Sequence, residues 1–277
     1  MTTPVPTAAL NSGAAMPQIG FGVFLVEPGV TQKVVEDALD VGYRHIDTAT
    51  GYDNEAQVGA ALKASGIRRD EMFVTTKLLN ADHREGNVEA GFENSLRLLG
   101  LDAVDLYLVH WPMPANRRYV DTWEQFVAFS QDGRATSIGV SNFQIDHLND
   151  IIRATGVSPA VNQIEFHPLF QQPELRAYHL EHGIVTESWG PLGQGKTDIF
   201  ERPAIVGPAR SHGVTPAQVI LRWHVQLGNV AIPKSSSRAR MIENLDVAGF
   251  ELSDTEMAAI AALDENLRVS RHPDDVN

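Results

Sequence analysis

The sequence predicts an α/β protein of the (β/α)8, or TIM, barrel class that begins with a short β-hairpin. Eight short apolar runs recur along its 277 residues, amphipathic segments separate them, and no change in composition marks a linker. Strands that alternate with helices predict a parallel sheet. Eight such strands in a chain of roughly barrel length favour a closed barrel over an open sheet. We therefore expect residues 1–277 to form a single domain.

The strand-like runs are rich in β-branched residues and too continuous for strands with one exposed face, so both faces are expected to be covered. Before them, PTAALNSGAAMPQ predicts a hairpin with NSG at its turn. Helix start signals stand out at TPAQ (215–218) and SDTE (253–256). The eight strands are expected at 19–23, 45–48, 72–78, 104–110, 135–141, 160–166, 183–189 and 229–235.

Composition excludes several classes of function. The net charge of −13 argues against nucleic acid and against anionic membrane surfaces as partners. The chain has no cysteine, so disulfides, thiol nucleophiles and cysteine-ligated metals are excluded. No run approaches the roughly 18 apolar residues of a membrane span, and the N-terminus does not resemble a signal peptide. We expect a cytoplasmic protein and, since no apolar surface stripe demands a partner, a monomer.

Polar residues gather at the carboxyl ends of the expected strands, where barrel enzymes carry their chemistry. Asp47 and Tyr52 follow the second strand, Lys77 ends the third and His110 the fourth. Taken singly, each has an ordinary explanation: a helix cap, an ion-pair partner, a buried histidine or a surface tyrosine. Further along the rim lie Ser141, Asn142, Gln163, Trp189 and Lys234.

Together, the first four residues indicate general-acid catalysis on a carbonyl group. A lysine cation makes it easier for a tyrosine to lose its proton. Asp47 can hold Lys77 in place, and His110 can orient the carbonyl oxygen toward Tyr52. Because no activated serine or cysteine is evident as a nucleophile, hydride from a cofactor would complete the reaction.

A basic segment, PKSSSRARMIEN, stands out in this acidic chain. It places Lys234, Arg238 and Arg240 within seven residues, beside Ser235 and Ser236. Such a group of cations and hydroxyls could bind the 2′-phosphate of NADPH. The alternative is a solvated helix start.

Three long segments, GYRHIDTATGYDNEAQVG, SLRLLGLDAVDLYLVHWP and IPKSSSRARMIENLDV, resemble the signature regions of the aldo-keto reductases. The resemblance runs from about residue 7 to the tail. ESWGPLGQGK and RVSRHPDDV are further similar to the bacterial 2,5-diketo-D-gluconate reductases. The resemblance implies a barrel that binds NADPH across its rim and reduces aldehydes or ketones, with diketo sugar acids or other dicarbonyls as candidate substrates. It also implies that Tyr52 is the proton donor, that Asp47 and Lys77 tune it, and that His110 positions the substrate.

The resemblance assigns the cofactor and substrate contacts as well. Phe24 and Trp111, with the tail after Asp264, would line the substrate site. Trp189 would stack on the nicotinamide ring. The remaining expected cofactor contacts are Ser141, Asn142 and Gln163 at the carboxamide, Gly190, Pro191, Leu192, Gly193 and Gln194 along the pyrophosphate, and Arg240, Glu243 and Asn244 at the adenine.

The sequence departs from the family pattern at a few positions. Leu79 stands where many relatives have tryptophan, and Gly51 precedes the expected catalytic tyrosine. Arg117 and Arg118 lie in a loop where the usual pattern has no such pair. One hypothesis is that one of these arginines meets an anionic substrate; a pair of solvated charges is the alternative.

Other functions fit less well. A Rossmann dehydrogenase would need a G-x-G-x-x-G after its first strand, and GPLGQG at 190–195 has misplaced glycines. A metal-dependent hydrolase would need a histidine pair at the first strand ends; HLEH at 179–182 lies in a polar helical stretch, where we expect solvated surface and no metal. A non-catalytic NADPH-binding redox sensor or partner subunit stays open as an alternative, although it would have little need for all four catalytic groups.

Overall fold

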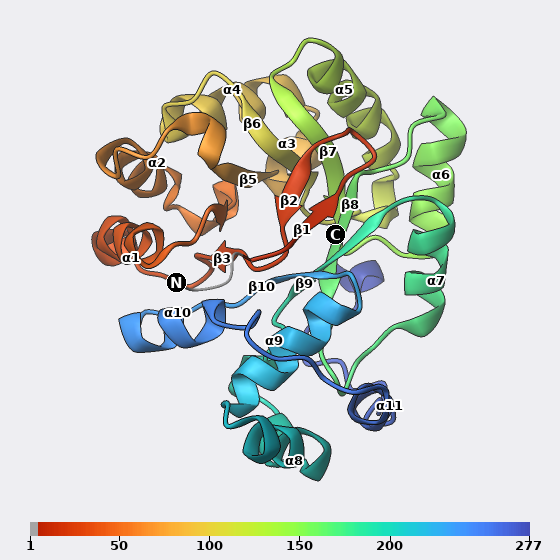
Figure 1. Ribbon diagram of the computed structural model, residues 1–277. Coiled ribbons are helices and arrows are strands. Elements are labelled where there is room, and N and C mark those ends of the chain that lie inside the picture. Colours follow the sequence, from red (N-terminus) through yellow and green to blue (C-terminus); the bar gives the residue numbers. More distant parts are fainter. Residues whose placement is uncertain (1–4) are drawn as a thin grey trace.

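The computed structural model describes residues 5–277, which form a closed barrel of parallel strands surrounded by helices (Figure 1). Neighbouring strands pair in chain order from β3 to β10. The strands are β3 (Phe21–Gly22), β4 (His45–Asp47), β5 (Phe73–Leu78), β6 (Val104–Val109), β7 (Ala135–Ser141), β8 (Val161–Glu165), β9 (Val185–Trp189) and β10 (Val230–Ile232). The predicted barrel class is thus confirmed.

The barrel closes between β3 and β10 through a short stretch of parallel pairing. Ile19 bridges Ala231, and the Ala231 N–H donates to Gln18 O at 2.8 Å. Several strands are shorter than the sequence pattern predicts. The last run, 229–235, is a strand only at Val230–Ile232, because Pro233 has no N–H with which to continue the ladder.

The predicted hairpin is present as β1 (Thr7–Ala9) and β2 (Ala15–Pro17), with Asn11 to Gly13 at the turn. It packs across the amino-terminal end of the barrel (Figure 1), where Ala8, Leu10 and Met16 cluster with Phe73 and Leu106 at the beginnings of β5 and β6. Because the hairpin closes that end, the opposite rim is left for the loops that follow the strands.

Helices cover the outside of the barrel and pack on the strands through a continuous apolar layer. Both predicted capping boxes are present, at Thr215 and Ser253. No helix within residues 5–277 is long and apolar enough to cross a membrane. The helices are α1 (Pro28–Val41), α2 (Glu55–Ala64), α3 (Asn80–Glu85), α4 (Val88–Leu99), α5 (Tyr119–Gln131), α6 (Ile145–Thr155), α7 (Pro173–Glu181), α8 (Pro203–His212), α9 (Pro216–Gln226), α10 (Arg238–Leu245) and α11 (Asp254–Ala261).

Candidate active site

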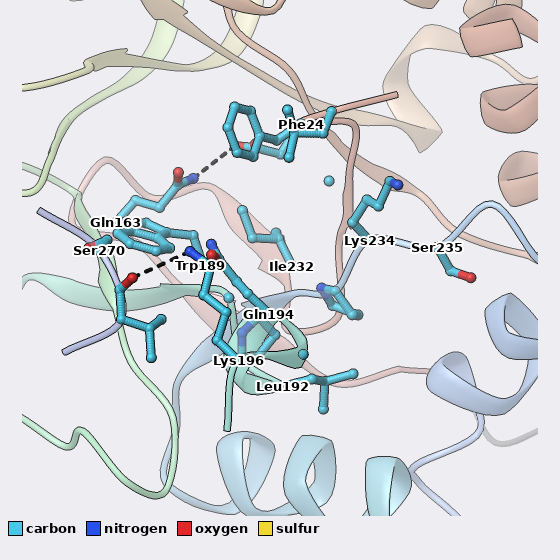
Figure 2. Close-up of a pocket in the computed structure, with 18 of the residues that line it drawn as sticks. Phe24, Gln163, Trp189, Leu192, Gln194, Lys196, Ile232, Lys234, Ser235 and Ser270 are labelled. Carbon is cyan, nitrogen blue, oxygen red and sulfur yellow. Dashed lines mark hydrogen bonds between the residues drawn. The ribbon is translucent and has the colours of Figure 1, made fainter. Parts of the chain in front are cut away.

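A pocket of about 1340 Å³ opens at the carboxyl-terminal rim of the barrel. Pockets for drug-sized molecules occupy up to about 1,000 Å³, so this one has room for a dinucleotide and a small substrate. Figure 2 shows its length, from Gln163 and Trp189 at one end to Lys234 and Ser235 at the other. Most of the residues predicted for the site line it: Phe24, Asp47, Tyr52, His110, Trp111, Ser141, Asn142, Gln163, Trp189, Gly190, Pro191, Leu192, Gln194, Lys234, Ser235, Arg240, Glu243 and Asn244.

Asp47, Tyr52, Lys77 and His110 meet at this rim. Lys77 is fully buried behind the pocket, and its Nζ donates to Asp47 Oδ1 at 2.6 Å, to Thr48 O at 2.9 Å and to the Tyr52 hydroxyl at 3.3 Å. The short helical turn Thr50–Tyr52 after β4 carries the phenol back over the barrel. The rings of Tyr52 and His110 meet edge to face, with 5.7 Å between their centroids.

The electrostatics of this group keep its members in defined protonation states. Burial, the largest influence, lowers the pKa of Lys77, but the charge and hydrogen bond of Asp47, with smaller contributions from Tyr52 and Glu187, together outweigh it and the pKa of the ammonium is raised. Burial raises the pKa of the Tyr52 phenol, and Lys77 opposes part of the rise. Burial, and then the Lys77 charge, lower the pKa of His110 to about 3. At neutral pH the site therefore holds a protonated phenol, an ammonium ion and a neutral imidazole.

Ser141, Asn142 and Trp189 form a second hydrogen-bonded group beside these residues. Asn142 follows β7 with φ +64, a left-handed conformation that asparagine tolerates better than most residues. In this position its Nδ2 donates to His110 O at 3.0 Å, and its Oδ1 accepts from Trp189 Nε1 at 2.9 Å. Ser141 Oγ donates to Gln163 O at 2.8 Å. The indole and the backbone of His110 are thereby held in fixed positions at the pocket wall.

Gln163 connects the Asp47 carboxylate to Glu187, a buried carboxyl group on β9. Its Nε2 donates to Asp47 Oδ2 at 2.8 Å and to Glu187 Oε2 at 2.9 Å. Because both N–H groups are used in this way, Oε1 is the polar atom that Gln163 can offer to the pocket it lines. Sequence reasoning missed Glu187. The signal was its place two residues before Trp189 in an apolar run, which puts both side chains on the same face of the strand.

The opposite end of the pocket is basic, but not all of the predicted residues reach it. Lys234, Ser235 and Arg240 line the pocket, whereas Ser236 and Arg238 are not among its described lining residues. Arg238 forms ion pairs with Asp37 and Asp40 of α1 instead. Its guanidinium is thus held by acidic groups on the outer surface of the barrel. Gly193 and Lys77 also lie outside the described pocket lining.

The chain tail closes one side of the pocket, and Glu165 holds it there. The Glu165 carboxylate accepts from the backbone N–H groups of Val269, at 2.6 Å, and Ser270, at 3.2 Å, and from the Ser270 hydroxyl. Lys196 Nζ, in the loop after β9, donates to Val269 O at 3.3 Å. Val269, Ser270 and Arg271 line the pocket; that the tail after Asp264 borders the substrate itself stays a prediction. Glu165 itself was not predicted.

Arg117 and Arg118, one of which could meet an anionic substrate by hypothesis, lie outside the described pocket lining. Arg117 is exposed and forms an ion pair with Asp150 on α6 at 2.7 Å, and neither it nor Arg118 belongs to the described pocket lining.

Gly51 and Leu79, the two departures from the family pattern near Tyr52, lie next to each other. A Cβ placed on Gly51 would lie 3.4 Å from Leu79 Cδ1, so the leucine fills the space directly beside the loop that carries Tyr52.

The prediction that HLEH lies on solvated surface is wrong for its first histidine. His179 is buried, and its two ring nitrogens lie 2.9 Å from Asn162 Nδ2 and 2.9 Å from Thr186 Oγ1. The His179 side chain on α7 points inward because Asn162 and Thr186, its two polar partners, lie beneath the helix on β8 and β9. Within the described part of the chain, no group of three or more histidine, aspartate or glutamate side chains could hold a metal ion.

Comparison with known proteins identifies the family. The model of the aldo/keto reductase family matches residues 25–265. The chain belongs to the aldo/keto reductase family. An aldo-keto reductase of Mycobacterium sp. (strain KMS) is 47% identical over 272 residues, which cover 98% of both chains. Methylglyoxal reductase DkgA of Salmonella typhimurium is 47% identical over 265 residues, or 96% of each chain.

A solved structure with the same fold also bears on the site. The crystal structure of a mutant of Gox0644 in complex with NADPH superposes with a TM-score of 0.92 at 45% identity, and the match covers 99% of this chain and 98% of that one. The family predicted from the three long segments is therefore confirmed, and this aldo-keto reductase is an oxidoreductase.

Proposed function

We propose that this aldo-keto reductase reduces the carbonyl group of an aldehyde or ketone with NADPH, and that Tyr52 donates the proton to the carbonyl oxygen. The observation that carries the proposal is the placement of the Tyr52 hydroxyl at the pocket wall, 3.3 Å from a buried lysine that is itself paired with Asp47. The phenol is protonated at neutral pH, and the cation behind it stabilises the phenolate that forms when the proton leaves.

The residues of the pocket fit NADPH. At one end, the flat Trp189 lies beside Ser141, Asn142 and the Oε1 atom of Gln163, which match a ring that carries a carboxamide. At the other end, Lys234, Ser235 and Arg240 match a phosphate. When bound, NADPH supplies hydride. The protein residues bind and orient the substrate: His110, a neutral imidazole, donates a hydrogen bond to the carbonyl oxygen, and Phe24 and Trp111 provide apolar walls.

Small dicarbonyls are the proposed substrates. One relative is a methylglyoxal reductase, which supports this choice. The pocket lining also supports it, because it combines the apolar side chains of Phe24 and Trp111 with the polar side chains of Tyr52 and His110. Diketo sugar acids are the second candidate. Three expectations stay predictions: that residues 1–277 form one domain, that the protein is a monomer and that it is cytoplasmic.

NADPH consumption by the wild type and by Tyr52→Phe tests the proposal, measured over a panel of aldehydes, α-dicarbonyls and keto sugar acids. Loss of the general acid is expected to lower kcat by about 10² to 10⁴ while the Kd for NADPH stays unchanged. A Tyr52→Phe variant as active as the wild type would refute the role of the phenol. A wild type that binds NADPH and reduces no carbonyl would favour the redox-sensor alternative.

A further inference from the structure

A row of buried polar side chains runs through the barrel interior behind Tyr52. It begins at His45 on β4 and passes through Glu187, Gln163 and Asp47 to Lys77. The hydrogen bonds from Gln163 to Glu187, from Gln163 to Asp47 and from Lys77 to Asp47 all lie between 2.6 and 2.9 Å. The expected catalytic groups form one end of this row. The other end, His45 and Glu187, has no role in the proposed reaction.

Glu187 is fully buried and poorly provided with hydrogen-bond donors. Oε2 accepts one bond, from Gln163, whereas the buried Oε1 has no hydrogen-bond partner among the residues that the structure describes. Oε1 lies 3.7 Å from Nε2 of the His45 ring, beyond hydrogen-bond distance. A buried carboxylate needs several donors or a cation to balance its charge, so this environment favours the protonated acid.

The charged and titratable groups around Glu187 agree with a neutral state. Asp47 and His45 face it from β4, Lys77 from β5 and the Tyr52 phenol from the loop after β4, while its register partner on β10 is the apolar Val230. Burial, and then the Asp47 charge, raise the pKa of Glu187 to about 8, and the hydrogen bond from Gln163 and the Lys77 charge offset only part of the rise.

His45 is neutral as well, so the His45 ring and the Glu187 carboxyl group do not form an ion pair. Burial lowers the pKa of His45 to about 4, although the nearby Asp47 opposes the change. The ring is confined on one side by Gly20, where an added Cβ would lie 2.4 Å from Nδ1. Nδ1 lies 3.4 Å from Pro17 O and so carries the proton. Nε2 is then an acceptor, with Thr75 Oγ1 at 3.2 Å and Glu187 Oε1 at 3.7 Å.

We propose that Glu187 is a positioning residue for carbonyl reduction: as the neutral acid it fixes the Gln163 amide between two carboxyl groups and leaves Asp47 as the single carboxylate beside Lys77. The inference rests on the proposed function, in which Tyr52 must give up its proton. Ionised Glu187 would place a second negative charge behind Lys77, and that charge raises the pKa of Tyr52. Proton donation from Tyr52 then becomes harder.

The rate of reduction should therefore depend on the protonation state of Glu187 and fall as Glu187 ionises. Below the pKa of Glu187 the acid is neutral and reduction proceeds at its full rate. As pH rises through that pKa, we expect the chemical step to slow, by no more than about tenfold, the factor of one pK unit, because Glu187 is the weakest of the groups that act on Tyr52. Tyr52 itself, with a raised pKa, loses its proton only at higher pH.

The test compares single-turnover reduction by the wild type and by Glu187→Gln between about pH 6 and 10. Glutamine copies the neutral acid: its oxygen accepts from Gln163 and its uncharged amide nitrogen takes the place of Oε1 beside the His45 ring. We therefore expect an unchanged rate at low pH, an unchanged Kd for NADPH and no slowing near the pKa of Glu187. Asp105→Asn is the matched control: Asp105 is a partly buried carboxyl on β6 whose pKa is also raised by burial, and it accepts from the Val74 N–H at 2.7 Å and pairs with Arg69, away from the site. Its pH profile should follow the wild type.

Infrared difference spectra supply a readout that does not depend on turnover. The wild type should show the C=O stretch of a buried protonated carboxyl that disappears at alkaline pH and is missing in Glu187→Gln. Identical pH profiles in the two proteins, or no band assigned to Glu187, would overturn the inference while leaving the reductase proposal in place. A wild type that reduces no carbonyl would overturn both.

Discussion

Replacing Asp47 by asparagine removes the charge that stabilises the Lys77 ammonium. Lys77 Nζ and Asp47 Oδ1 are 2.6 Å apart, and the two side chains are 0% and 2% exposed. At an effective dielectric constant of about 20, two unit charges at that separation attract by about 6 kcal/mol, which corresponds to roughly four to five pK units. Without this attraction most of what opposes burial is lost, because Tyr52 and Glu187 offset only part of it, and the pKa of Lys77 should fall well below its ordinary value.

The consequence for catalysis is a changed pH profile. Above the lowered pKa, Lys77 is a neutral amine and Tyr52 loses the cation that stabilises its phenolate. We expect single-turnover reduction by Asp47→Asn to fall by about 10² or more at pH 8, and to recover partly as the pH is lowered and Lys77 takes up a proton. Asp105→Asn, which removes a partly buried carboxyl paired with Arg69 away from the site, should behave as the wild type. An Asp47→Asn profile parallel to that of the wild type would refute the reasoning.

The stability of the same variant provides a second check. In Asp47→Asn the folded pKa of Lys77 lies below the unfolded value of about 10.4. Between the two pKa values the unfolded chain binds the extra proton, so the free energy of unfolding should rise with pH relative to the wild type. In the wild type the pKa of Lys77 is raised instead, so its contribution is fully present below the unfolded pKa and is lost only at higher pH. Urea unfolding at about pH 6 and pH 9 measures the difference.

Two further predictions concern the cofactor end and the packing of the helices. Arg240→Ala should raise the KM for NADPH at least about tenfold, which is the loss of a charge-assisted hydrogen bond, and should change the KM for NADH little. Arg238→Ala should change the KM for NADPH less than about threefold, because Asp37 and Asp40 already hold that arginine. Similar losses in both variants would contradict this prediction. Gly59→Ala should lower the free energy of unfolding by about 1 to 3 kcal/mol, since its Cβ would lie 2.4 Å from Leu99 O. Gly29→Ala, with no described atom within 4 Å, should be neutral or stabilising by up to about 1 kcal/mol in urea unfolding.

Local patterns in the sequence determined the barrel, the hairpin and most of the pocket. Short continuous apolar runs mark strands whose two faces are both buried, and capping residues such as Thr215 and Ser253 act on neighbours three residues away. The carboxyl ends of parallel strands share one rim, so the sequence alone predicts that Asp47, Lys77 and His110 lie near one another.

Only the tertiary structure decided which groups at that rim act on one another, because those contacts join residues far apart in the chain. Arg238 carries the charge expected of a phosphate ligand, yet acidic residues about 200 positions earlier hold it on the outer surface. His179 reads as polar surface, but partners on two strands draw it inward. The protonation of Glu187 depends on what the closed barrel places around its two oxygens. The sequence names the chemical groups; burial and through-space contacts decide their charge.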